Sequence, residues 1–117
     1  MPSTAQLSSK SRRFPRVPTD TLAEVTLLGD RRDRRRAKIA WVKVLGAGGC
    51  MLVSDDSIGF LSLMELRINL GGRELSADGR VCWENRRGPA EHHVGIEFIR
   101  IGRSDRAAIE ALVAAAA

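Results

Sequence analysis

The sequence predicts a mainly β fold: a small six-stranded antiparallel β-barrel followed by one C-terminal α-helix. Short runs of alternating apolar and polar residues, separated by glycine-rich turns and followed by a helical apolar pattern, carry this prediction. At 117 residues the chain can build one modest core and not two. We expect a disordered tail at residues 1–10, a single domain at residues 11–114 and a second short tail at residues 115–117.

Composition excludes several classes of protein. No apolar run approaches the roughly 20 residues needed to cross a bilayer, and residues 1–10 lack the apolar centre of a signal peptide. We therefore expect a cytoplasmic protein that does not enter a membrane. Cys50 and Cys82 lie in apolar, strand-like runs without metal-ligand spacing, which predicts small core residues. No nucleophile–base pair or metal cluster emerges, so we expect no enzyme, no catalytic residue, no metal and no cofactor.

Positive charge is concentrated in the first third of the chain. Residues 1–38 carry ten Lys and Arg against four Asp and Glu, whereas residues 39–117 carry nine against ten. An excess placed in this way predicts one positive face and an anionic partner, whether nucleotide, nucleic acid or acidic protein.

An arginine strap precedes the first strand-like run. An aromatic residue and Pro15 separate Arg12 and Arg13 from Arg16, and Pro18 follows. Proline lacks an N–H and disfavours helix at the preceding residue, so the strap should be extended and stiff. Guanidinium groups form bidentate hydrogen bonds with phosphates and stack on bases, which suits a phosphate-bearing ligand. A solvated basic tail is the alternative that these residues leave open.

Three strands are expected in the first half. Residues 23–28 and 37–44 are rich in β-forming side chains, and the arginine-rich residues 31–36 between them predict an exposed hairpin tip that also discourages aggregation. Residues 45–49 hold three glycines, which favours a bulge or tight turn where another backbone or a ligand approaches closely. Residues 50–53 form the third strand.

Two further strands are joined by a tight hairpin. Residues 61–70 alternate in the manner of a strand buried on one face. Gly71 and Gly72 are typical of a two-residue hairpin turn. Residues 73–84 return as the fifth strand, and residues 85–89 turn the chain again.

The last strand and a helix complete the fold. Residues 92–101 alternate, with His92 and His93 expected as polar residues at the strand edge. Ser104 is a candidate N-cap, and residues 106–114 carry apolar side chains at helical spacing, so the helix can cover an open end of the barrel.

The order of these signals resembles the PilZ domain family. The strap, a strand running into a glycine-rich turn, the Gly-Arg-Val-Cys-Trp of residues 79–83, the Val-Gly-Ile-Glu-Phe of residues 94–98 and the final helix carry the resemblance over residues 11–113. It implies a six-stranded barrel with a C-terminal helix that acts in bacteria as a receptor for cyclic di-GMP (c-di-GMP).

The family grips this ligand with two elements, an Arg-x-x-x-Arg strap and an Asp/Asn-x-Ser-x-x-Gly motif. Arg12 and Arg16 match the first element. In the second, Gly49 matches the glycine, but Val44 stands at the Asp/Asn position and Gly46 at the Ser position. The resemblance also implies that Trp83 lies near the nucleotide, although ordinary barrel packing explains this residue equally well. The implied ligand-binding set is Arg12, Arg13, Arg16, Gly46, Gly49 and Trp83.

Two functions of different kinds follow. The first is a c-di-GMP receptor module weakened by loss of the second motif's side chains. The second is a degenerate PilZ adaptor that binds no nucleotide and contacts an effector protein, for example in surface motility or polysaccharide secretion. General nucleic-acid binding is a weaker third possibility, because no stacking platform of aromatic residues accompanies the charges. The sequence predicts neither the oligomeric state nor the effector.

Overall fold

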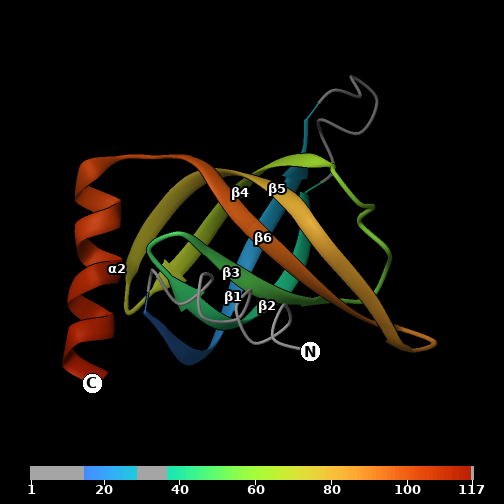
Figure 1. Cartoon of the computed structure of the whole chain (residues 1–117), viewed down its shortest axis with the longest axis horizontal. Coiled ribbons are helices and arrows are strands. Elements are labelled where there is room, and N and C mark those ends of the chain that lie inside the picture. Colours follow the sequence, from blue (N-terminus) through green and yellow to red (C-terminus); the bar gives the residue numbers. More distant parts are fainter. Residues whose placement is uncertain (1–14, 29–36, 117) are drawn as a thin grey trace, which may run out of the picture.

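The structure, a computed structural model, describes residues 15–28 and 37–116. Within them, six antiparallel strands close into a barrel in the order β1-β2-β3-β6-β5-β4, and one helix follows (Figure 1). The elements are β1 (Arg16–Leu27), β2 (Ala37–Gly46), β3 (Gly49–Ser54), β4 (Leu63–Leu70), β5 (Arg73–Gly88), β6 (Glu91–Ile101) and α2 (Arg103–Ala116). The predicted fold class is confirmed.

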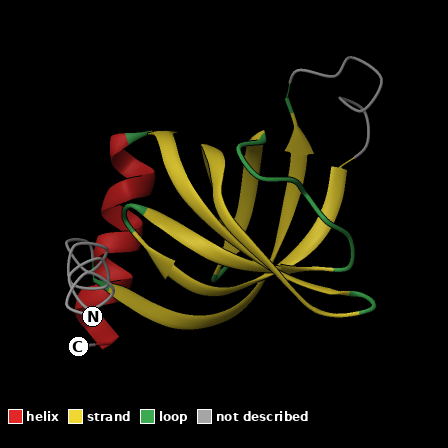
Figure 2. Cartoon of the chain, turned by 45° about the vertical axis from the view of Figure 1, so that its right-hand side comes forward, coloured by secondary structure: helices red, strands yellow, loops and turns green. Residues whose placement is uncertain are grey.

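The barrel interior is filled by alternate side chains of every strand. In β4, for example, Met64, Leu66 and Ile68 are buried while the residues between them are more exposed. The helix α2 stands at one end of the barrel, where Ile109 is completely buried in the same core (Figures 1 and 2). Burying one side chain of this size stabilises the fold by about 1.5–3 kcal/mol. The helix therefore closes that end as a structural part of the core.

β1 begins seven residues earlier than expected, at Arg16 instead of residue 23. The end of the strap is thus part of the sheet, with Arg16 opposite Gly46 and Pro18 opposite Val44. Proline is tolerated because this part of β1 pairs with β2 only, whereas pairing with β4 begins at Ala23. The prediction that the whole strap precedes the first strand was wrong. Arg12 and Arg13 lie outside the described residues, as do residues 31–36.

The helix also begins earlier than the predicted N-cap. It starts at Arg103, so Ser104 lies in its first turn, where its hydroxyl accepts a hydrogen bond from Arg73. Asp105 accepts hydrogen bonds from the Ser76 amide and from the Arg73 guanidinium, both with a donor–acceptor distance of 3.1 Å. The Ser76 amide first and the Arg73 guanidinium second hold the pKa of the Asp105 carboxyl below its usual value. These contacts join the start of α2 to the start of β5.

The two cysteines have different environments. Cys50 is buried, and burial raises the pKa of its thiol to about 12, so it is an unreactive core residue as expected. Cys82 is exposed, which contradicts the prediction that it packs in the core. Cys82 follows the regular alternation of β5, in which Leu75, Ala77, Gly79 and Val81 are buried, and so faces outward. The irregularity in the pairing of β5 with β6 between Val81 and Trp83 breaks this alternation one residue later and leaves Trp83 exposed as well.

The close approach of β3 to β6 explains why residue 49 in the glycine-rich turn is glycine. A Cβ atom on Gly49 would lie 2.1 Å from the backbone oxygen of Ile96 in β6. By contrast, Gly71 and Gly72 have φ values of +58° and +88° and form the predicted hairpin turn. Gly49 is therefore required for β3 to pack against β6.

We expect Gly49→Ala to lower the free energy of unfolding by about 1–3 kcal/mol, because the new methyl group meets backbone that cannot move aside. Gly88→Ala is the matched control, since its Cβ would meet only the Glu91 side chain at 3.7 Å. Urea denaturation of both variants measures the difference. Equal stability of the two variants would contradict the close approach.

Candidate functional site

One row of residues crosses five strands on the outside of the barrel. Arg16 lies opposite Gly46, Gly46 opposite Gly49, Gly49 opposite Glu97, and Glu97 opposite Arg80. Residues directly opposite each other in paired strands share a face of the sheet. We call this set the arginine row. It brings three of the predicted site residues onto one surface.

A second row lies beside the first. Pro18, Val44, Met51, Gly95 and Trp83 are opposite one another in the same succession of strands. We call this set the tryptophan row, and the two rows together the outer wall. The side chains of the tryptophan row are apolar, so this row forms an apolar floor beside the charged ends of the arginine row.

The beginning of β1 closes over the glycine-rich turn. A Cβ atom on Gly46 would lie 2.8 Å from Cγ of Arg16 and 2.8 Å from the backbone oxygen of Pro15. The space that a serine side chain would need at this position is therefore occupied by the chain itself. The close approach predicted for residues 45–49 is made here by the chain's own backbone.

Trp83 lies against the backbone of the neighbouring strand. A Cβ atom on Gly95 would be 2.0 Å from Nε1 of Trp83 and 2.3 Å from its Cε2, so only glycine allows the indole to lie there. The side chain nevertheless remains 43% exposed. Trp83 thus packs on the barrel, as the second interpretation of the sequence expected, and keeps part of its ring exposed to solvent.

The charges of the outer wall lie at its two ends. Glu97, the one acidic residue of the two rows, is paired with Arg80. Both side chains of this pair are 46% exposed, so the pair contributes little stability. At the other end Arg16 is exposed beside the glycine-rich turn. The wall therefore carries an arginine at each end of its apolar floor, and the charge of Arg80 is balanced by Glu97.

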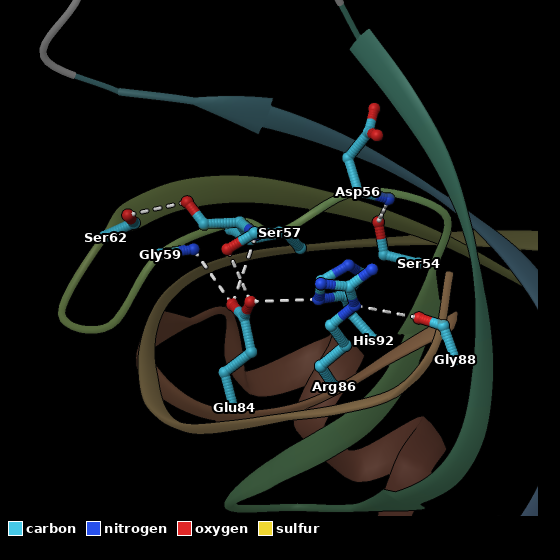
Figure 3. Close-up of polar contacts among 10 residues, drawn as sticks. Ser54, Asp56, Ser57, Gly59, Ser62, Glu84, Arg86, Gly88 and His92 are labelled. Atoms are coloured by element: carbon cyan, nitrogen blue, oxygen red, sulfur yellow. Dashed lines mark hydrogen bonds and ion pairs between the residues drawn. The ribbon is translucent and has the colours of Figure 1, made fainter. Parts of the chain in front are cut away.

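Apart from the outer wall, the structure contains a polar cluster around Glu84 that the sequence analysis did not predict (Figure 3). The carboxylate of Glu84 accepts hydrogen bonds from the Ser57 hydroxyl at 2.5 Å and from the amides of Ile58 at 3.1 Å and Gly59 at 2.9 Å. Nδ1 of His92 lies 3.4 Å from the same carboxylate. Burial alone raises the pKa of Glu84. The hydroxyl, the two amides and the histidine together outweigh burial and hold this pKa below its usual value.

This cluster corrects the prediction for one histidine. The side chain of His92 is only 13% exposed, as is that of Glu84, so His92 is not a polar residue of an exposed edge. The two residues meet because β5 and β6 pair with Arg86 opposite His92 and Glu84 opposite Val94. Only the hairpin register could have revealed this contact. Among the described residues no group of three or more His, Cys, Asp or Glu side chains is arranged to hold a metal ion.

We expect Glu84→Gln to lower the free energy of unfolding at pH 7 by about 1.5–3 kcal/mol, the range for hydrogen bonds to a charged group. Because the folded pKa lies below the usual 4.5, the stabilisation from Glu84 is complete above that value and is lost as the pH falls through the folded pKa. The variant should therefore lose part of the acid sensitivity of the wild type below pH 4.5.

Denaturation at several pH values measures this effect, with Glu110→Gln on the exposed face of α2 as control. If wild type and Glu84→Gln lose stability in parallel on acidification, the carboxylate does not hold the connection between β3 and β4.

Several solved structures share this fold. The PilZ domain of YcgR from Escherichia coli with c-di-GMP superimposes with a TM-score of 0.69 at 10% identity, covering 89% of each chain. The PilZ domain of CeSA from a cellulose-synthesizing bacterium has a TM-score of 0.60 at 17% identity, covering 86% of this chain and 96% of that one. The Bacillus subtilis inhibitor of motility, MotI/DgrA, has a TM-score of 0.71 at 15% identity and 90% coverage of this chain. This chain spans 50% of the length of MotI.

Sequence comparison identifies the family. No curated protein matches the chain significantly. No helix in residues 15–28 or 37–116 has the length and apolar character needed to cross a membrane. The family model of the PilZ domain matches residues 10–115, which is nearly the whole sequence. The chain therefore belongs to the PilZ domain family.

Proposed function

We propose that this protein is a cytoplasmic c-di-GMP receptor module, formed by a single domain over residues 11–114, that binds its ligand on the outer wall. The observation that carries the proposal is the strand register, which sets Arg16, Gly46 and Gly49 in one row and Trp83 in the next. The related PilZ domain of YcgR was solved with c-di-GMP, which supports the choice of ligand.

Each part of the wall has a role in this proposal. Arg16, together with Arg12 and Arg13 that precede it in the sequence, binds phosphate oxygens or the O6/N7 edge of guanine. The exposed indole of Trp83 offers an apolar surface to a base or ribose, and Val44 extends that surface. The ligand carries two negative charges, which suits the basic excess of residues 1–38.

The affinity should be modest. Three charge-assisted hydrogen bonds at about 1.5–3 kcal/mol each are of the same order as the roughly 8 kcal/mol of a micromolar complex, before the cost of ordering the strap. Replacing a polar side chain by Val44 and a hydroxyl by Gly46 removes about 1–1.5 kcal/mol each. A ten- to hundredfold weaker complex than a micromolar one follows, with a Kd of roughly 10–100 µM.

Isothermal titration of c-di-GMP tests the proposal. Wild type should bind saturably, and Arg16→Ala should weaken binding at least about tenfold, because it removes one charge-assisted contact. Arg87→Ala is the matched control, an exposed arginine near the β5–β6 turn and away from the glycine-rich turn. The absence of binding by wild type at several hundred micromolar would refute the receptor function.

Restoring the second motif should have opposite effects at its two positions. Val44→Asp should tighten c-di-GMP binding about tenfold, because residue 44 is partly exposed on the wall and the aspartate provides a polar partner for the ligand. Gly46→Ser should weaken binding, because its side chain displaces Pro15 and Arg16. The same titration compares the two variants. Tighter binding by Gly46→Ser would show that the start of β1 does not occupy this space.

A protein-binding adaptor remains a second candidate, favoured by one observation. The apolar floor continues beyond the tryptophan row, since Trp41 lies opposite Leu22 on one side and Val53 on the other. Trp41 and Leu22 are 44% and 43% exposed. The fold relative MotI is an inhibitor of motility, which is consistent with an effector in motility. Absence of nucleotide binding combined with loss of effector binding in Trp41→Ser would favour this function.

A further inference from the structure

The arginine row contains one carboxylate, that of Glu97, which has no role in the receptor function proposed so far. Glu97 lies in β6, opposite Gly49 on one side and Arg80 on the other. Its Oε1 accepts a hydrogen bond from Arg80, which is the partner of this side chain in the described part of the chain. The side chain is 46% exposed, and an ionised carboxylate can accept about four hydrogen bonds. Glu97 therefore keeps acceptor capacity on its solvent side.

Glu97 lies on the same outer face as Trp83. The indole of Trp83 packs on Gly95, which precedes Glu97 by two residues in β6. Residues two apart in a strand point to the same face and are separated by about 7 Å. This separation is comparable to the width of a purine. A base stacked on the exposed part of the indole can therefore direct one edge along β6 toward the carboxylate.

The negative charge of Glu97 acts on this part of the wall. Cys82 directly precedes Trp83 in β5. Burial first and the charge of Glu97 second raise the pKa of the Cys82 thiol, whereas the charge of Arg80 lowers this pKa by less. At Cys82 the field of Glu97 is thus not cancelled by Arg80. A carboxylate in this place repels a ligand with two negative charges unless it also contacts hydrogen-bond donors of that ligand.

Guanine supplies such donors. Its N1–H and its N2 amino group lie side by side on one edge, and the oxygens of a carboxylate accept hydrogen bonds from both. Arginine cannot take this role, because a guanidinium group only donates. Val44 stands at the Asp/Asn position of the second motif, so Glu97 is the acidic residue that the two rows of the wall offer to this edge.

We propose that Glu97 recognises the N1–H and N2 amino edge of one guanine of the ligand and is the specificity-determining residue of the outer wall. This inference rests on the proposed function as a c-di-GMP receptor. Arg80 keeps its contact with Oε1 and orients the carboxylate, and the guanine edge binds on the solvent side. The arginines and stacking on Trp83 supply most of the attraction for the ligand, whereas Glu97 selects the base.

Two cyclic dinucleotides that differ at this edge test the proposal. Cyclic di-IMP has the phosphates, the N1–H and the O6/N7 edge of c-di-GMP but lacks the N2 amino group. Wild type should bind c-di-GMP about tenfold more tightly than cyclic di-IMP, because one charge-assisted hydrogen bond is lost. In Glu97→Met, whose side chain has similar length but no strong acceptor, the two Kd values should agree within about twofold. Isothermal titration measures the four Kd values.

Glu65→Met is the matched control. Glu65 is another partly exposed glutamate paired with an arginine, Arg67, but it lies in β4 outside the wall. This variant should keep the preference of the wild type for c-di-GMP, and circular dichroism checks that both variants fold.

The outcomes separate this inference from the receptor function. Equal binding of the two nucleotides by wild type, or a preference that persists in Glu97→Met, would overturn the role of Glu97 and leave the receptor function intact. Failure of wild type to bind either nucleotide at several hundred micromolar would refute the receptor function and this inference with it.

Discussion

The register of the closed barrel is the constraint on which the rest of the structure depends. Closure leaves no free strand edge, so each strand pairs with a neighbour on both sides over part of its length. The register of each strand is therefore set by two neighbouring strands. At one critical point, between Gly49 and Ile96, the backbones approach so closely that only glycine fits. Residues that are far apart in the sequence, such as Arg16 and Arg80, thereby become ends of one row.

In the proposed receptor, Val44 and Gly46 shape the outer wall in two ways. Val44 joins the apolar floor that ends in Trp83, and Gly46 lets the start of β1 lie directly over the turn. Apolar surface and backbone contact thus take the place of side-chain hydrogen bonds in the proposed site. A ligand bound to this wall would depend more on contacts with arginine and on stacking than on hydrogen bonds to the edges of its bases.

Strand alternation and turn chemistry were sufficient to predict the barrel, the Gly71–Gly72 hairpin and the terminal helix, because these depend on local patterns. Features that depend on pairing were not predictable. Pro18 lies in β1 because this stretch pairs with β2 only, and an irregularity in the pairing of β5 with β6 leaves Trp83 exposed directly after the outward-facing Cys82. The contact of Glu84 with His92 needed the register of a hairpin. The positions of Arg12 and Arg13 lie outside the described residues, so their part of the site remains a prediction.

In the proposed receptor, c-di-GMP occupies the outer wall beside Trp83. The chain has only two tryptophans, so its indole N–H groups give two resolved signals in a ¹H–¹⁵N NMR spectrum. Titration with c-di-GMP should shift the signal of Trp83 progressively to saturation and move that of Trp41, in the row beyond, much less. Unchanged signals at millimolar nucleotide, or a saturating shift confined to Trp41, would contradict the account.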